Sequence, residues 1–92
     1  MNWDDTIAAI ATPPGEAGIA VLRISGSSAF RIADQIFLSS HRPSQSPTHT
    51  IHYGKIINPQ TKEIIDTVLV SVFRAPKSYT GEDMVEISCH GG

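Results

Sequence analysis

Four side chains that could bind a metal or do chemistry lie close together near the end of the 92-residue chain: Asp83, Glu86, Cys89 and His90. In an extended segment, Glu86 and His90 share one face, and Asp83 and Cys89 share the other. The spacing matches no zinc pattern such as paired Cys-x-x-Cys. His90 points away from its neighbour Cys89 and is badly placed to deprotonate it. We therefore predict no metal site and no catalytic residue here, and interpret Cys89 as a small buried apolar residue.

Two further charges stand in the middle of apolar segments, Arg23 in AVLRIS and Glu86 in MVEIS. One interpretation places both on a solvated face of a sheet. The other places them on covered central strands, where a buried charge must be paired or bound by a ligand. If the two strands are neighbours, Arg23 and Glu86 can pair with each other or line a pocket. A carboxylate suits a ligand edge with two N–H donors, and an arginine suits an anionic group.

Two glycine-containing motifs have structural interpretations. PPGEAG (13–18) fits neither G-x-G-x-x-G nor G-x-x-x-x-G-K-[ST], so we predict a sharp turn between strands and no nucleoside triphosphate site. TGED fits the pattern [ST]-x-x-[DE], so Thr80 and Asp83 are expected to close a tight loop that leads into the last strand.

Hydrophobic periodicity predicts the elements that position these residues. One amphipathic helix is expected over Ala29–Leu38, after serines that can cap its first turn. Ala29, Phe30, Ile32, Ala33, Ile36 and Phe37 lie on its apolar side. Strands are predicted at Thr6–Thr12 (buried), Gly18–Gly26, His49–Ile57, Ile64–Ala75 and Met84–His90.

The segments between and within these strands support one small sheet. The polar segment Ser39–Thr48 is a surface loop, and Asn58–Glu63 is the turn of a hairpin. Along Ile64–Ala75, Val68, Val70 and Val72 share one face. The order β-β-α-β-β-β predicts an α+β fold with a mixed or antiparallel sheet and one packed helix.

Composition limits the class of protein. Hydrophobic residues make up 40% of the chain, which allows the core of one small domain. The net charge of −2 argues against a main nucleic-acid surface on this segment. A single cysteine fits a reducing compartment, and no apolar run is long enough to span a membrane. We expect a cytoplasmic protein without a membrane segment.

Two long segments, DTIAAIATPPGEAGIAVLRISG and FRAPKSYTGEDMVEISCHGG, resemble the amino-terminal domain of the tRNA-modification GTPase family MnmE/TrmE. The resemblance is strong over about 5–28 and 73–92, and the middle is matched in kind rather than in letters. It implies a fold similar to the tetrahydrofolate-binding domain of the glycine-cleavage T-protein.

The resemblance also implies a function for the parent protein. Residues 1–92 would be its amino-terminal folate-binding and dimerisation domain, truncated at its carboxy-terminal end and without the helical and GTPase domains. The domain would bind 5-formyltetrahydrofolate and form a homodimer. With the flavoprotein MnmG, the parent would modify carbon 5 of the wobble uridine in tRNA. Its GTPase domain would require K⁺ and Mg²⁺.

Carried over to this sequence, the family's folate contacts fall on Arg23 and Glu86. Glu86 would accept hydrogen bonds from the amide and amino edge of the pterin, and Arg23 would engage a polar or anionic part of the folate. Other family contacts, including a lysine, lie beyond Gly92, as do the GTPase motifs and the carboxy-terminal cysteine motif. The alternative is a purely structural assembly domain, in which Arg23 and Glu86 form a salt bridge or face solvent.

Overall fold

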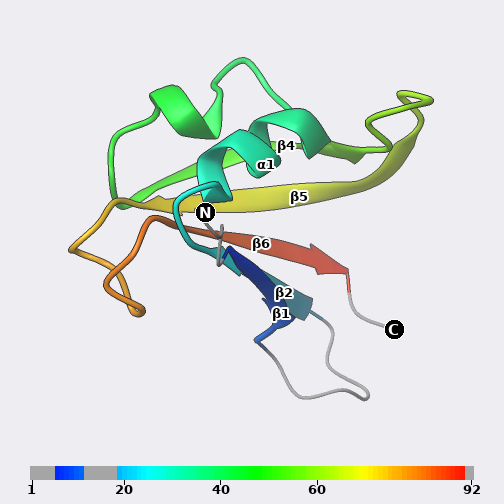
Figure 1. Cartoon of the computed structure of the whole chain (residues 1–92). Coiled ribbons are helices and arrows are strands. Elements are labelled where there is room, and N and C mark those ends of the chain that lie inside the picture. The colour runs from blue at the N-terminus through cyan, green and yellow to red at the C-terminus, as the bar shows by residue number, and fades with distance from the viewer. Residues whose placement is uncertain (1–5, 12–18, 91–92) are drawn as a thin grey trace, which may run out of the picture.

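The computed structural model describes residues 6–11 and 19–90 and shows one antiparallel sheet with a helix on one side (Figure 1). The predicted α+β class is confirmed. The elements are β1 (Ile7–Ile10), β2 (Ile19–Ser25), α1 (Ala29–Ile36), β3 (Phe37–Leu38), the 3₁₀-helix η1 (Pro43–Gln45), β4 (Thr50–Ile57), β5 (Ile64–Phe73) and β6 (Met84–His90). The six strands lie in the order β1-β2-β6-β5-β4-β3.

The centre of the sheet is built from β2, β6 and β5, which come from distant parts of the chain. β2 pairs with β6 from Ile19–His90 to Ser25–Met84, and β6 pairs with β5 on its other side. Side chains alternate across each strand, so every second residue points toward α1. On β5 these are Val68, Val70 and Val72, each at most 3% exposed, which confirms the predicted alternation.

The covered face of the sheet and α1 share one hydrophobic core. The helix buries Ala29, Phe30 and Ala33 against it. Ile32 was expected on the apolar side but is 36% exposed. The serine cap is also a wrong prediction. Ser28 is the N-cap residue but has φ −101° and ψ 8°, outside the extended region that aims a serine at the first turn, and its side chain makes no capping bond.

The helix is two residues shorter than predicted, because Phe37 and Leu38 form the short strand β3. Its pairs with β4 are Phe37–Ile56 and Leu38–Lys55. Gly54 on β4 makes this approach possible. A Cβ atom there would lie 2.5 Å from both the Leu38 carbonyl oxygen and Cε1 of Phe37. Tertiary pairing therefore replaces the last helical turn that periodicity alone predicts.

The first strand is present but is not buried, contrary to expectation. Among the described strands β1 lies at the edge of the sheet and pairs with β2 alone, and all four of its residues are exposed. Ile7 is 65% exposed and Ile10 is 71% exposed. The apolar composition of this segment led to the wrong prediction, because composition does not say how many neighbours a strand has.

The predicted hairpin is confirmed by the antiparallel pairing of β4 with β5. Asn58 initiates its turn, since its side-chain oxygen accepts hydrogen bonds from the amides of Gln60 and Thr61. The predicted surface loop after the helix contains η1, which packs beside α1 (Figure 1). The predicted turn at 13–18 lies outside the described residues.

Candidate functional site

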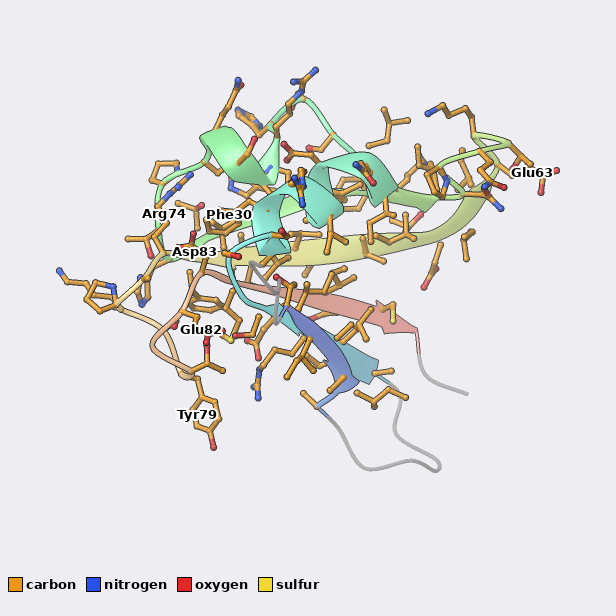
Figure 2. All side chains as sticks on the ribbon, in the orientation of Figure 1. Phe30, Glu63, Arg74, Tyr79, Glu82 and Asp83 are labelled. Carbon is orange, nitrogen blue, oxygen red and sulfur yellow. The ribbon has the colours of Figure 1, made fainter. Side chains whose placement is uncertain are left out.

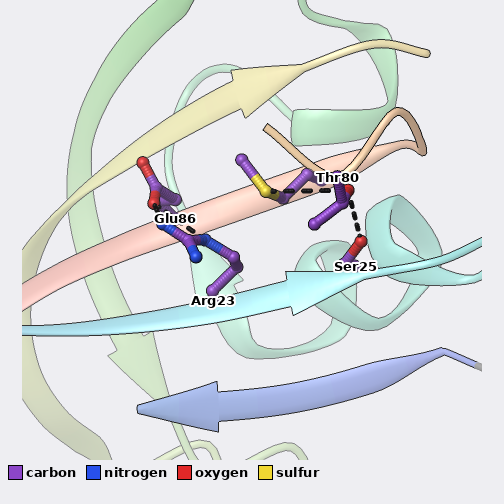
Figure 3. A network of polar contacts seen from close by, with 5 residues as sticks. Arg23, Ser25, Thr80 and Glu86 are labelled. Carbon is purple, nitrogen blue, oxygen red and sulfur yellow. Dashed lines mark hydrogen bonds and ion pairs between the residues drawn. The ribbon is translucent and has the colours of Figure 1, made fainter. Parts of the chain in front are cut away.

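Arg23 and Glu86 lie opposite each other on β2 and β6, in the middle of the sheet. The Arg23 guanidinium donates to Oε2 of Glu86 through Nε at 3.0 Å and through Nη2 at 2.6 Å (Figure 3). Both bonds go to one oxygen, and Oε1 of Glu86 has no hydrogen-bond partner within 6–11 and 19–90. The side chains are 28% and 22% exposed, respectively. Strand alternation places the pair on the face of the sheet opposite α1. Its exposed fractions show that it is half-buried rather than fully solvated.

The loop from Arg74 to Asp83, hereafter the β5–β6 loop, is fastened beside this pair. Oγ of Ser25 on β2 lies 2.7 Å from Oγ1 of Thr80 and donates to Glu82 at 3.2 Å. Thr80 also lies 4.0 Å from the Met84 sulfur (Figure 3). Asp83 accepts from the amide of Ala75 and so closes the base of the loop. The expected role of TGED in closing a tight loop is confirmed by these contacts.

The β5–β6 loop and the sheet border an open hollow of about 570 Å³, hereafter the Arg23–Glu86 hollow. Its lining comprises Arg23, His49, Phe73, Pro76, Lys77, Ser78, Tyr79, Met84 and Glu86. The Tyr79 ring lies 4.8 Å from the Arg23 guanidinium carbon, and the side chain is 83% exposed at the end of the loop (Figure 2). His49 meets Phe73 edge-on at 5.2 Å.

This lining can bind a flat, polar, anionic molecule. The volume lies within the range of about 300–1,000 Å³ that is usual for small-molecule sites. Aromatic and thioether groups provide apolar contact area, and Glu86 is the one carboxylate in the lining, beside the cations Arg23 and Lys77. A carboxylate with one unpartnered oxygen can accept from an N–H edge, and the cations favour an anionic substituent.

The sequence identified the two charges at the centre of the hollow but not the residues around them. Arg23 and Glu86 stood out because each interrupts an apolar strand. Tyr79, Lys77 and His49 lie in loops without periodicity. His49 was assigned to a strand, yet its φ of +61° places it just before β4. Tyr79 and Lys77 lie within the quoted segment FRAPKSYTGEDMVEISCHGG, but no pattern there distinguishes them from their neighbours.

The other singled-out residues do not join the hollow. Cys89 is half-buried and packs against the hydrophobic core, with its sulfur 3.5 Å from the Ala20 carbonyl oxygen. Asp83 bonds to the loop backbone. Within the part of the chain that the structure describes, no three His, Cys, Asp or Glu side chains gather in a way that could hold a metal ion. No helix there is long and apolar enough to cross a membrane.

Comparison with known proteins identifies the family. The family model described as "GTP-binding protein TrmE N-terminus" matches residues 6–92. The tRNA modification GTPase MnmE of Lactobacillus gasseri is 58% identical over 88 residues, which are 96% of this chain and 19% of that protein. The proteins of the same name from Enterococcus faecalis and Carboxydothermus hydrogenoformans are 55% and 56% identical over 96% and 97% of the chain. The chain spans about a fifth of the length of these relatives. This match over nearly all of the chain shows that it belongs to the TrmE amino-terminal domain family.

Proposed function

We propose that this chain is the folate-binding module of a tRNA-modification GTPase and that the Arg23–Glu86 hollow binds 5-formyltetrahydrofolate. The observation that carries the proposal is the state of Glu86. Arg23 holds its carboxylate through Oε2, while Oε1 lacks a partner among the described residues, and the side chain lines a hollow of ligand size. A pre-positioned carboxylate with one unused oxygen is suited to the paired N–H donors of a pterin edge.

Each part of the folate has a matching group in the hollow. Glu86 accepts from the amide and amino edge of the pterin, and Arg23 keeps the carboxylate in place while offering its remaining N–H groups to a polar or anionic part of the ligand. Tyr79, Phe73 and His49 give aromatic surface for the flat ring. Lys77 adds a second cation, which favours a ligand that carries carboxylates.

For the parent protein we propose the remaining functions that the family resemblance implies. Residues 1–92 form the amino-terminal domain, which dimerises and supplies the folate one-carbon unit. A separate GTPase domain hydrolyses GTP with K⁺ and Mg²⁺. Together with MnmG, the parent modifies carbon 5 of the wobble uridine of tRNA in the cytoplasm. The names of the relatives, tRNA modification GTPase MnmE, support the tRNA substrate and the GTPase activity.

A structural assembly domain without a ligand is the second candidate. The observation that favours it is that Arg23 and Glu86 already satisfy each other, so no ligand is needed to neutralise either charge. In addition, exposed apolar residues share their face of the sheet, which suits subunit packing. Ligand titration separates the two candidates, whereas self-association does not.

The first test is a calorimetric titration of the chain with 5-formyltetrahydrofolate. We expect saturable binding, and we expect Glu86→Gln to weaken it roughly 10- to 100-fold, the range for hydrogen bonds to a charged group. The matched control is Glu63→Gln, which removes the same charge from the β4–β5 turn, at the opposite end of the sheet from the β5–β6 loop (Figure 2). Unchanged affinity in Glu86→Gln would remove the proposed role. If the unaltered chain does not bind, the titration is repeated on a longer chain that supplies the family contacts beyond Gly92, and absence of binding there would favour the assembly domain.

A further inference from the structure

A second, smaller hollow lies on the other side of the sheet, next to α1. Its volume is about 290 Å³, and it is formed by the segment between α1 and β4 together with one residue of β4. It is lined by Ser39, Ser40, His41, Arg42, Gln45, Ser46, Pro47 and His52. We call it the Arg42 hollow. Its lining contains one guanidinium, two imidazoles and three hydroxyl groups but no carboxylate. Because the hydroxyls of Ser39 and Ser46 already donate to the carbonyl oxygens of Tyr53 and Arg42, the groups left for an anion are mainly the guanidinium and the imidazoles.

The segment that forms the Arg42 hollow is held firmly by the rest of the domain. Asp34 of α1 accepts from both the amide and the hydroxyl of Ser44. Arg74 donates to the carbonyl oxygens of Ser44 and Ser46, at 2.8 and 2.9 Å. The Arg74 guanidinium also lies over the Phe30 ring at 4.7 Å, and Figure 2 shows the two side chains close together below η1. The segment is therefore pre-organised, which reduces the entropy lost on binding.

The groups that line the hollow retain unused hydrogen-bonding capacity. Arg42 is exposed, and its guanidinium makes no hydrogen bond or ion pair with other residues in the described ranges. The His41 and His52 rings lie 5.5 Å apart. Each uses one ring nitrogen on a hydroxyl, His41 Nδ1 on Ser40 and His52 Nε2 on Thr50. The second nitrogen of each imidazole can thus serve a ligand.

We propose that the Arg42 hollow binds a backbone phosphate of the RNA substrate. A phosphate favours a cation with further N–H donors beside it, and the guanidinium of Arg is a usual contact for phosphodiester oxygens. RNA is favoured over other phosphate carriers because the relatives are named tRNA modification GTPases. The inference rests on the proposed tRNA substrate but is independent of the folate site, which lies on the opposite face.

A single phosphate contact agrees with the overall charge. The chain carries a net charge of −2, which does not support an extended nucleic-acid surface. One rigid donor cluster can nevertheless fix the register of an RNA that is bound mainly elsewhere on the parent, since phosphate contacts position and base contacts specify. The contribution of the Arg42 hollow is therefore modest in affinity and dependent on salt.

The experiment is an NMR titration of the ¹⁵N-labelled chain with a short RNA stem-loop, and separately with inorganic phosphate. We expect RNA-dependent shifts of the amides from Ser39 to His52 at low salt. Arg42→Gln should raise the Kd for the stem-loop about threefold to tenfold and reduce the slope of log K against log salt by about one. Lys62→Gln is the matched control, because it removes one exposed positive charge from the distant β4–β5 turn.

Each outcome decides the question. Larger loss in Arg42→Gln than in Lys62→Gln supports the phosphate site. Equal loss in both variants, shifts located elsewhere, or no RNA-dependent shift at about 1 mM RNA would overturn it, because even non-specific phosphate binding is normally tighter than this. Shifts that appear with inorganic phosphate but not with the stem-loop would identify a site for free phosphate and also reject the RNA proposal. Folate binding, measured in parallel, reports on the proposed function separately.

Discussion

Arg23 and Glu86 form a salt bridge whose exposure and geometry favour a small contribution to stability. Both side chains keep about a quarter of their surface exposed, so solvent screens their attraction. The bonds also converge on one carboxylate oxygen rather than forming a two-oxygen fork. The geometry thus favours orientation of the carboxylate over a large contribution to folding.

This leads to a prediction for the pair. In a double-mutant cycle with Arg23→Met and Glu86→Gln, the coupling in the free energy of unfolding should be below about 1 kcal/mol, because exposed ion pairs reach no more. Urea denaturation of the four proteins measures it. A coupling of about 3 kcal/mol or more would instead identify a buried structural pair and would support the assembly domain.

The sequence singled out the two charges at the centre of the Arg23–Glu86 hollow but not the residues around them, for a physical reason. A charge within an apolar strand has few explanations, and strand alternation places it on a known face. Tyr79 and Lys77 have no such signal, because their position depends on how Ser25, Thr80 and Glu82 fasten the β5–β6 loop. Such contacts join residues 55 to 57 positions apart, and a sequence pattern does not reveal them.

At the level of elements, local preference and tertiary pairing compete at the end of α1. The apolar periodicity continues through Phe37, yet Phe37 leaves the helix and pairs with Ile56 of β4. The Phe37 ring packs directly against Gly54, where the Cβ atom of any other residue would collide with it. The strands Thr50–Ile57, Ile64–Phe73 and Met84–His90 were predictable because alternation and turn residues agree with their partners. The two-residue β3 was not, because it depends on that partner alone.

Gly54→Ala tests this account. Alanine normally suits a strand better than glycine, so local preference predicts a neutral or stabilising change. We expect destabilisation of about 1–3 kcal/mol instead, because the new methyl group must displace the Phe37 ring or the Leu38 backbone. Thermal and urea unfolding measure the effect. Lys55→Ala, the next residue on the same strand, is the control, and equal stability of the two variants would contradict the close-packing argument.

On the scale of the whole molecule, the sheet has two unlike faces. One carries α1 and the hydrophobic core, and the other carries the Arg23–Glu86 hollow. The second face also presents Ile7, Ile19, Ile51, Tyr53 and Leu69, which are between 46% and 68% exposed. The register places them on the same side as Arg23 and Glu86. An uncovered apolar face of this kind is typical of a surface that packs against another protein surface.

The proposed dimerisation can be tested on that face. If it forms the contact between two copies, Tyr53→Glu should raise the dimer dissociation constant at least tenfold, because it places a charge where Tyr53 and Leu69 pair across β4 and β5. Sedimentation equilibrium over a range of concentrations measures this. Ile32→Glu introduces the same charge on α1, on the other side of the sheet, and should leave the constant unchanged. Equal weakening by both variants would point to a general loss of folding, whereas weakening by Ile32→Glu alone would move the interface to the helix side. A dimer through the uncovered face would bring the Arg23–Glu86 hollows of the two copies toward the contact. Folate binding should then rise with the concentration of dimer, so Tyr53→Glu should weaken both dimerisation and folate binding.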